Sequence, residues 1–362
     1  MGIDDTTLRL GERRPARAAL SNAVGRFEPQ SRVTVDDGWD LEEDLRLLRT
    51  EVAQERPRSA LSYNRSPDLP FDRSVNPYRG CEHGCIYCFA RPSHAWLNLS
   101  PGLDFETKLI ARPGIAAVLA RELSAKTYRP AVIALGTNTD PYQPIEAQAR
   151  LMRQVLEVLA DHRHPVAVTT KGTLVERDID LLAPMAAQGL ARVGISITTL
   201  DRDLARRMEP RAPSPQRRLE VIRRLTQAGI PVRVMVAPVI PGLTDSDLEP
   251  ILAAAKAAGA VAASFILLRL PREVAPLWQD WLTTHYPGRA AKVMARLRDL
   301  HGGRDYDPEF GKRMRGEGIW ADLLARRFQL AVARLRLNVQ MPPLRTDLFA
   351  PPDKPGDQLR LF

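Results

Sequence analysis

The sequence contains little cysteine and no long apolar run, and both absences exclude classes of protein. Among its 362 residues the only cysteines are Cys81, Cys85 and Cys88, an odd number that argues against a disulfide framework. The most apolar stretch, residues 257–268, is bounded by charged side chains and is too short to span a bilayer. No apolar leader follows the first methionine, so secretion is not indicated either. We therefore expect a cytoplasmic protein that does not act in a membrane.

Hydrophobic residues make up 44% of the chain, which is enough to build a sizeable core. Short β-branched runs alternate with stretches of helical periodicity. The runs fall at residues 74–78, 131–135, 166–170, 192–197, 232–236 and 262–268. Helices are predicted between them at residues 145–159, before Gly189, at 215–228 and at 247–258. Strands that alternate with helices of this length indicate βαβ units, and hence an α/β fold with a parallel sheet of six strands.

Four regions of the chain differ in composition. Residues 1–70 form a polar, proline-dotted extension with one helical stretch predicted near 41–55. Residues 71–285 carry the alternating strands and helices. Residues 286–340 are typical of a basic helical extension, and residues 341–362 form a tail whose five prolines predict flexibility. We expect one α/β core between two extensions, followed by a flexible tail.

The net charge of +9 is concentrated in one region. Residues 289–336 contain 12 lysines and arginines and 6 acidic residues, so this segment carries +6 of the total. A basic surface attracts polyanions, and a nucleic acid is the partner that this excess favours. A solvated helical face in an arginine-rich protein would show the same excess, and charge alone does not separate the two.

The three cysteines lie close together in the stretch CEHGCIYC, residues 81–88. The spacing C-x3-C-x2-C supplies three thiolates, one fewer than a [4Fe–4S] cluster used only for electron transfer normally has. One iron of such a cluster would stay open to an exogenous ligand. Zinc is the alternative, because His83 could complete a Cys3His set, although it sits inside the loop with little freedom to converge on the thiols.

This loop resembles the cluster loop of the radical S-adenosylmethionine (SAM) superfamily, including the aromatic Tyr87 before the last cysteine. The resemblance covers roughly residues 70–285 and implies a partial (β/α)6 TIM-like barrel. It also implies that Cys81, Cys85 and Cys88 hold a [4Fe–4S] cluster whose open iron binds the amino and carboxylate groups of SAM. One electron then cleaves SAM and releases a 5′-deoxyadenosyl radical. A radical SAM enzyme is therefore expected.

Polar residues stand at the carboxyl ends of the predicted strands, where parallel α/β folds collect their functional groups. They belong to the stretches 136–146, 169–171, 196–199 and 237–242. Burying such groups unpaired costs about 1–3 kcal/mol each. We therefore expect them to surround a ligand rather than to fill the core.

The stretch TDPYQPIE at residues 139–146 and the pair Thr170-Lys171 resemble the spore photoproduct lyase-like branch of the superfamily. That resemblance implies where the ammonium of SAM lies: near Asn138, Thr139 and Asp140. Asp140 could instead cap a helix that starts near Pro144.

The resemblance also implies contacts for the rest of SAM. The carboxylate would pair with Lys171 or with Arg211, which is one of several arginines in its region. Lys171 could instead be a solvated loop lysine. Ser196 would hydrogen-bond the methionyl or ribose end, and Tyr87 with the backbone at Ala237 would hold the adenine.

One departure from the lyase concerns the hydrogen atom that ends its reaction. The lyase returns this atom through an additional cysteine, whereas all three cysteines here are assigned to the cluster. Either a tyrosine donates the hydrogen atom, with Tyr142 and Tyr306 as candidates, or 5′-deoxyadenosine returns it, or the reaction differs from that of the lyase. Repair of the same photoproduct does not follow from the resemblance.

The last residues of the sequence, QLRLF, resemble the Gln-Leu-x-Leu-Phe peptide with which bacterial polymerases and repair proteins dock into the DNA sliding clamp. Gln358, Leu359, Leu361 and Phe362 would enter the hydrophobic pocket of the clamp. Packing of Leu361 and Phe362 on the chain's own domain is the alternative.

Two functions from different classes fit these observations. The first is a radical SAM enzyme that abstracts a hydrogen atom from a nucleic acid in DNA repair or modification, with protein or RNA as alternative substrates. A flavodoxin or ferredoxin would be its electron donor. The second is a non-catalytic nucleic-acid-binding module that is stabilised by a metal.

Overall fold

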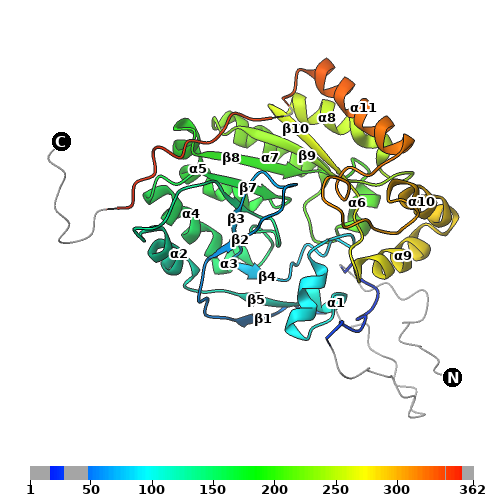
Figure 1. Cartoon of the computed structure of the whole chain (residues 1–362), viewed down its shortest axis with the longest axis horizontal. Coiled ribbons are helices and arrows are strands. Elements are labelled where there is room, and N and C mark those ends of the chain that lie inside the picture. Colours follow the sequence, from blue (N-terminus) through cyan, green and yellow to red (C-terminus); the bar gives the residue numbers. More distant parts are fainter. Residues whose placement is uncertain (1–16, 28–47, 339, 353–362) are drawn as a thin grey trace, which may run out of the picture.

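The structure is a computed structural model that describes residues 17–27, 48–338 and 340–352. Its main element is a seven-stranded sheet in the order β10-β9-β8-β7-β6-β3-β2 (Figure 1). The strands are β2 (Leu61–Tyr63), β3 (Arg73–Val75), β6 (Ile133–Leu135), β7 (Val166–Thr170), β8 (Ala191–Ser196), β9 (Val232–Val239) and β10 (Ala262–Leu267). The strands from β3 to β10 in this order are parallel, and β2 pairs antiparallel with β3. The predicted partial (β/α)6 TIM-like barrel is confirmed.

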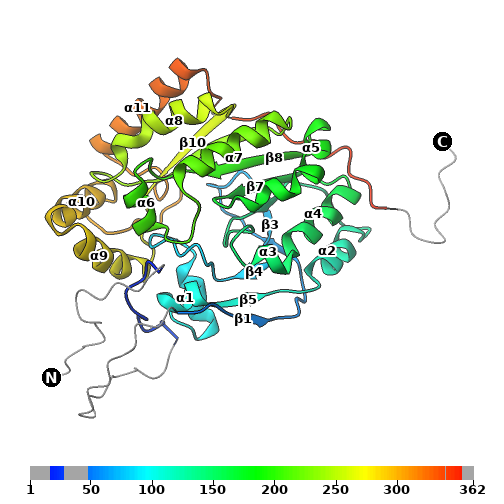
Figure 2. The ribbon, with the colours of Figure 1, turned by 180° about the vertical axis from the view of Figure 1, so that it is seen from behind.

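Helices connect the parallel strands and cover one face of the sheet (Figure 2). They are α2 (Ile115–Leu123), α3 (Glu146–Ala149), α4 (Leu151–Asp161), η2 (Leu174–Asp178), α5 (Ile179–Ala187), α6 (Arg202–Met208), α7 (Pro215–Gln227), η3 (Asp245–Asp247) and α8 (Leu248–Ala257). Leu156, Ile222 and Ile251 place apolar side chains of α4, α7 and α8 in the core and are fully buried. Each such side chain contributes about 1.5–3 kcal/mol through burial. The apolar residues that recur with helical periodicity in the sequence therefore stabilise the packing of these helices on the sheet.

The helix predicted at residues 145–159 is broken in two. Arg150 separates α3 from α4 and has a φ of 51°. The carboxylate of Glu146 accepts hydrogen bonds from the backbone nitrogens of Met152 (3.0 Å) and Arg153 (3.4 Å). These donors belong to the first turn of α4, where backbone N–H groups lack helical partners. The side chain of Glu146 thus restarts the helix after the break.

A second sheet, in the order β1-β5-β4, borders the cysteine loop. It consists of β1 (Glu51–Gln54), β4 (Tyr78–Arg79) and β5 (Lys108–Ala111), with η1 (Arg91–Leu97) and α1 (Leu103–Thr107) between β4 and β5. The helix predicted near residues 41–55 is wrong at its described end, because residues 51–54 pair in parallel with β5. Pairing with a distant strand outweighs local helix propensity here. Residues 41–47 lie outside the described residues.

The chain after residue 285 closes the free edge of β10. It contains α10 (Pro287–Leu300) and α11 (Ile319–Leu335), which follow α9 (Val274–His285). Ala263 N donates to Asn338 O (2.9 Å), and Leu267 N donates to Met314 O (3.0 Å). An open edge of this kind would expose unpaired backbone groups. The basic extension is therefore packed against the barrel and borders the end of β10.

Residues 341–352, which were predicted to be part of a flexible tail, pack against the barrel instead. Arg345 N donates to Gly189 O (3.0 Å), and Ala350 N donates to His162 O (3.1 Å). The ring of Phe349 lies 5.5 Å from that of Tyr128 between centroids. Gly189 and His162 precede β8 and β7, so this segment crosses the amino edge of the sheet. Apolar residues among the prolines account for the difference.

The predicted boundary at residue 70 does not coincide with an edge of the fold. Strand β2 lies within residues 1–70, yet it pairs with β3 in the main sheet.

Among the described residues, no helix has the length and apolar character that crossing a membrane requires.

Candidate functional site

The cysteine loop joins β4 to η1, and two glycines shape it. Gly80 and Gly84 have φ values of 75° and 64°, a region that favours glycine. A Cβ atom at Gly84 would also approach Glu106 Oε2 to 2.7 Å. Two tight turns follow, in which Gly84 N donates to Cys81 O (3.2 Å) and Cys88 N donates to Cys85 O (3.1 Å). As a result all three cysteines face one cavity.

This cavity encloses about 190 Å³ at the carboxyl ends of the parallel strands. Besides the cysteines it is lined by seven of the residues predicted to contact SAM, namely Tyr87, Asn138, Thr139, Asp140, Lys171, Ser196 and Ala237. They come from the cysteine loop and from the ends of β6, β7, β8 and β9. Parallel pairing brings these ends to one edge although they are far apart in the sequence.

The donor set fits an iron–sulfur cluster. Burial raises the pKa of Cys81 well above its usual value and that of Cys85 to about 12. Thiols in such surroundings give up their protons to a cation that replaces them, as cluster irons do. Among the described residues, no group of three His, Cys, Asp or Glu side chains could hold one metal ion. Three thiols around one cavity suit a cluster, because each thiolate then binds a different iron.

His83, the fourth ligand of the zinc alternative, faces a carboxylate. Its Nδ1 atom lies 3.3 Å from Asp140 Oδ2, and its side chain is buried. Asp140 also accepts hydrogen bonds from Tyr142 N (2.9 Å), from Thr170 Oγ1 (2.6 Å) and from Lys171 N (2.7 Å). Burial would raise the pKa of Asp140, but the charge and hydrogen bond of His83 and these donors lower it to about 2. Asp140 therefore ties the cysteine loop to the ends of β6 and β7, rather than capping a helix.

The rest of the stretch at residues 139–146 holds the cysteine loop from outside. Thr139 Oγ1 donates to Tyr78 O (3.0 Å). The amide of Gln143 donates to Gly80 O (3.2 Å) and accepts from Glu82 N (2.8 Å). These bonds fix the backbone on both sides of Cys81, so this stretch positions the loop that carries the thiols.

Lys171 extends its ammonium into the cavity. Its Nζ atom donates to Ser196 Oγ (3.1 Å) and lies 5.8 Å from the centroid of the Tyr87 ring. Ser196 Oγ in turn donates to Ala237 O (3.2 Å). Lys171 forms no ion pair with a described residue, so its charge is available to an anion. A solvated loop position, the alternative for Lys171, does not match this geometry.

A buried ion pair fixes Tyr87. Glu209 pairs with Arg218 and accepts a hydrogen bond from the Tyr87 hydroxyl and another from Thr198 Oγ1 (2.8 Å). Burial would raise the pKa of Glu209, but the charges of Arg218 and Lys171, together with the hydrogen bonds from Arg218 and Tyr87, lower it to about 2. Arg218 also donates to Ser196 O (3.0 Å). With its hydroxyl anchored, Tyr87 offers only its ring to a ligand.

Comparison with known proteins agrees with this site. The sequence matches the radical SAM superfamily over residues 75–255. The uncharacterized protein Rv2578c of Mycobacterium tuberculosis is 40% identical over 260 residues, which cover 71% of this chain and 75% of the relative. The chain belongs to the radical SAM superfamily. It is therefore an enzyme, and the alternative of a non-catalytic module is not supported.

Solved structures show the same fold for this radical SAM enzyme. Spore photoproduct lyase complexed with dinucleoside spore photoproduct superposes with a TM-score of 0.58 at 16% identity, covering 80% of this chain and 82% of the lyase. A double mutant of that lyase with bound AdoMet and the dinucleoside gives a TM-score of 0.56 at 16% identity, covering 80% and 82% of the two chains. An uncharacterized protein of Methanocaldococcus jannaschii is 28% identical over 174 residues, covering 48% of this chain and 62% of the relative. The barrel of the radical SAM enzyme is thus shared well beyond its close sequence relatives.

Arg211 is the one predicted SAM contact that the structure does not bring into the cavity. Its guanidinium pairs with Glu82 at 2.9 Å, and Glu82 also accepts from Thr50 Oγ1 (2.7 Å). Arg211 is absent from the cavity wall. A carboxylate within the cysteine loop thus holds the guanidinium outside, which leaves Lys171 as the predicted partner for the carboxylate of SAM.

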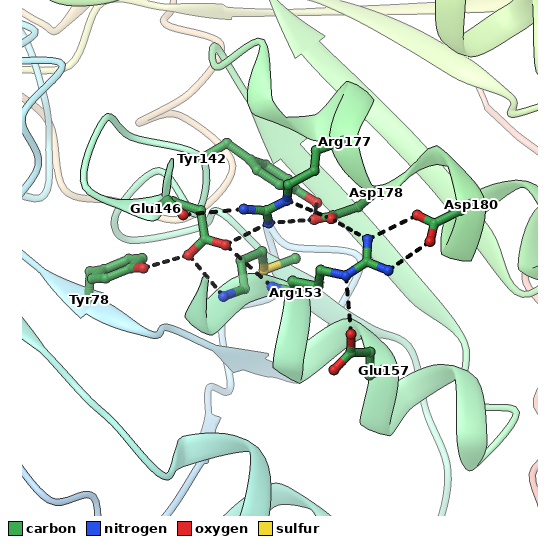
Figure 3. A network of polar contacts seen from close by, with 9 residues as sticks. Tyr78, Tyr142, Glu146, Arg153, Glu157, Arg177, Asp178 and Asp180 are labelled. Atoms are coloured by element: carbon green, nitrogen blue, oxygen red, sulfur yellow. Dashed lines mark hydrogen bonds and ion pairs between the residues drawn. The ribbon is translucent and has the colours of Figure 1, made fainter. Parts of the chain in front are cut away.

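The two tyrosines proposed as hydrogen donors also lie off the cavity wall. Tyr142 is buried behind the site, where its hydroxyl donates to Asp178 Oδ2 (3.0 Å) (Figure 3). Burial and this carboxylate raise the pKa of Tyr142 well above its usual value. Tyr306 lies in the loop between α10 and α11, with its ring 6.1 Å from that of His301. The structure therefore places neither hydroxyl at the wall of the cavity.

Two arginines of the site carry no signal in the sequence. Arg218 was not selected because its partner Glu209 lies on another element. Arg91 is fully buried below the cysteine loop, where it donates to Cys85 O (2.9 Å) and pairs with Glu106 at 2.5 Å. An arginine shortly after the last cysteine is an ordinary pattern, and only the three-dimensional contact shows that it holds the loop.

Proposed function

We propose that this radical SAM enzyme cleaves SAM reductively and abstracts a hydrogen atom from a nucleic acid, in DNA repair or modification. The observation that carries the proposal is a single cavity that joins three thiols to seven of the predicted SAM contacts. A [4Fe–4S] cluster bound by Cys81, Cys85 and Cys88 would supply the electron and the open iron for SAM. A flavodoxin or ferredoxin would deliver that electron, and a reducing cytoplasm would keep the thiols available.

The residues of the wall would orient SAM rather than react with it. Lys171 would bind the carboxylate, because its ammonium stands in the cavity without an anionic partner among the described residues. The ring of Tyr87, held by Glu209, would pack on the adenine beside the backbone of Ala237. Asn138 and Thr139 would face the ammonium, while Asp140 keeps their loop in place through its own four contacts.

The positions of the cysteines and of Tyr142 bear on which group returns a hydrogen atom to the product radical. With every cysteine of the chain on the cavity wall as a cluster ligand, no thiol is left to donate. Tyr142 is engaged with Asp178 behind the site. We therefore propose 5′-deoxyadenosine as the donor, with Tyr306 as the alternative if the loop that carries it reaches substrate.

A nucleic acid is the proposed substrate because of charge. Part of the basic segment 289–336 is neutralised, since Arg298, Arg313 and Arg327 pair with Asp305, Asp68 and Glu249. Other cations are exposed and form no ion pair with described residues, namely Arg289, Lys292, Arg315, Arg326, Arg334 and Arg336. The similar structure of spore photoproduct lyase complexed with dinucleoside spore photoproduct supports the same class of substrate.

The proposed DNA role includes a contact with the sliding clamp. Gln358, Leu359, Leu361 and Phe362 lie outside the described residues. Residues 341–352, however, run along the amino edge of the sheet, away from the cavity at its carboxyl edge. A peptide of residues 353–362 should bind purified clamp at micromolar affinity, about 8 kcal/mol, and Leu361→Ala with Phe362→Ala should remove this binding. Equal binding by the wild-type and double-variant peptides would contradict the assignment.

Anaerobic turnover tests the proposed function. The protein reconstituted with iron and sulfide should be brown and should release 5′-deoxyadenosine when SAM and a reductant are added. Single-stranded DNA, duplex DNA, RNA and a peptide mixture are then compared for stimulation of this release and for deuterium transfer from labelled substrate. Stimulation by DNA supports the proposal, and stimulation by peptide alone would overturn it. A colourless protein with one zinc per chain after reconstitution would overturn the cluster assignment as well.

A further inference from the structure

Two residues on the cavity wall have no role in the site described above. Phe89 directly follows the last cysteine, and Arg269 directly follows Leu268 at the end of β10. The Cζ atom of Arg269 lies 4.6 Å from the centroid of the Phe89 ring. Phe89 remains 46% exposed even so. An open aromatic ring and a guanidinium therefore stand side by side where the cavity meets solvent.

Arg269 forms no direct ion pair with a described residue, although the negative charges of Tyr306, Cys88 and Asp68 reach it from a distance. The carboxylate of Asp68 is already taken, because it accepts from Arg313 Nε (2.6 Å) and from Gly311 N (2.7 Å). Partial burial of a guanidinium without a direct ion-pair partner costs free energy, and an anionic ligand in contact with it would reduce that cost.

A second pair of the same composition lies on the loop between α10 and α11. The Cζ atom of Arg313 lies 4.7 Å from the centroid of the Phe310 ring, and Phe310 is 55% exposed. Met314 on this loop accepts the hydrogen bond from Leu267 N at the end of β10. The two arginines act on each other electrostatically. The second pair therefore borders the first.

We propose that Phe89 and Arg269 form a docking site for one unstacked nucleotide of a nucleic-acid strand, with its base on the ring and a neighbouring phosphate on the guanidinium. The exposed ring of Phe310 receives the next base along the strand, beside Arg313, which stays paired with Asp68. This inference rests on the proposed function and specifies its substrate as single-stranded or flipped-out nucleic acid.

The chemistry of the two pairs favours this ligand. Aromatic rings stack on any base, and an arginine fork matches a phosphate, so the combination tracks a strand without reading its sequence. A base within a duplex cannot bring its atoms to the cavity unless it leaves the stack. The site should therefore prefer a single strand or a mismatch to a perfect duplex.

Binding of a fluorescent single-stranded DNA oligonucleotide to the reconstituted holoenzyme tests the proposal. Arg269→Ala and Phe89→Leu should each weaken binding by roughly five-fold or more, the scale for a lost stacked base or phosphate. Arg269→Lys should recover part of the loss. Arg269→Ala should also reduce the slope of log affinity against log salt by about 0.7, the contribution of one phosphate on a single strand.

Matched controls separate this site from general charge. Arg121→Ala removes an exposed arginine from α2, and Tyr63→Leu removes an exposed ring from β2, at the edge of the sheet opposite β10. Both should bind the oligonucleotide within about two-fold of wild type, because neither lines the cavity. Phe310→Leu, on a loop remote in sequence from the cysteines, gives an independent test if Phe89→Leu loses iron. It should weaken binding by a smaller factor than Arg269→Ala.

Each outcome decides one point. Equal oligonucleotide binding by wild type, Arg269→Ala and Phe310→Leu would overturn the docking site while leaving the proposed function intact. A wild-type protein that binds neither DNA nor RNA would overturn the substrate class. Arg269→Ala that loses SAM affinity but keeps oligonucleotide affinity would assign Arg269 to SAM instead. Parallel arms with RNA and with perfect duplex establish which strand the site prefers, and preference for the perfect duplex would overturn the unstacked nucleotide.

Discussion

The polar network of Figure 3 and the wall of the cavity meet at residues 139–146, and they differ in whether their charged side chains form ion pairs. In the network of Figure 3, Arg177 pairs with Glu146 (2.7 Å) and with Asp178 (2.8 Å), so that cation and carboxylates match. On the cavity wall, Lys171 and Arg269 form no direct ion pair with a carboxylate among the described residues. Matched charge fixes a fold, whereas unmatched charge beside a cavity marks where a ligand binds.

The difference explains why Tyr142 and Glu146 belong to the scaffold. Glu146 accepts from Tyr78 Oη at 2.5 Å and from Arg177, while Tyr142 donates to Asp178. Arg153 joins Asp178 to the surface carboxylate of Asp180 at 2.7 Å. Residues that are close to a site in the sequence can thus have a structural role instead of binding a ligand. Whether their charges are paired within the protein distinguishes the two roles.

The largest effect is expected on the cavity side. Replacing any one of Cys81, Cys85 and Cys88 with Ala should abolish SAM cleavage and deplete iron, because two thiolates do not hold a cluster firmly. His83→Ala is the matched control from the same loop and should keep iron near the wild-type content. Iron and sulfide analysis checks this, and loss of iron in His83→Ala would show that the ligand set is misassigned.

On the scaffold side, Arg177→Met should lower the free energy of unfolding by about 3–5 kcal/mol, since it leaves the buried carboxylate of Glu146 without its cation and leaves Asp178 with Arg153 alone. Arg224→Met removes an exposed partner of Glu176 and should cost less than about 1 kcal/mol. Thermal and urea unfolding of the metal-free protein measure both values. Similar losses in the two variants would contradict the distinction between matched buried charge and surface charge.

Stability should also depend on pH through Glu209. Its pKa is lowered to about 2 in the fold, so it stabilises the folded state above the ordinary carboxyl pKa and loses this contribution as pH falls from about 5 towards 2. The contribution at neutral pH is on the order of 3 kcal/mol. Glu209→Gln should flatten the acid limb of a stability–pH curve of the metal-free protein. An unchanged acid limb in the variant would show that other carboxylates dominate it.

The smallest effects concern SAM itself and compare two cations. Lys171→Ala should weaken SAM binding by about 1.5–3 kcal/mol, the scale of a charged hydrogen bond, while iron content stays the same. Arg211→Ala should leave SAM affinity near that of wild type, because Glu82 holds this arginine away from the cavity. Anaerobic equilibrium dialysis with labelled SAM measures both affinities. A larger loss of SAM affinity in Arg211→Ala than in Lys171→Ala would show that Arg211 binds the carboxylate of SAM.

Local patterns in the sequence predicted the parts of the fold that depend on periodicity. The strand at residues 166–170 was predicted at its observed bounds, and the helix predicted at 215–228 ends one residue beyond α7. The three cysteines could be predicted as cluster ligands because they lie within eight residues of one another, in a short loop. Seven of the eight predicted SAM contacts line one cavity because strand ends in a parallel sheet meet at one edge.

The amino-acid pattern was thus enough to predict the order of the six parallel strands, the positions of four of the helices between them, the three neighbouring thiols and the edge of the sheet where the cavity lies. Which charges pair was decided by the tertiary structure alone. Glu82 pairs with Arg211, which is 129 residues away in the sequence. Glu209 accepts a hydrogen bond from Tyr87, which is 122 residues away. Arg269, after the edge strand β10, contacts the ring of Phe89. Periodicity reports which face of an element is buried, but the partner of a charged side chain depends on its direction across the fold. The directions of these side chains therefore decide which cations form ion pairs within the enzyme and which remain available to a ligand.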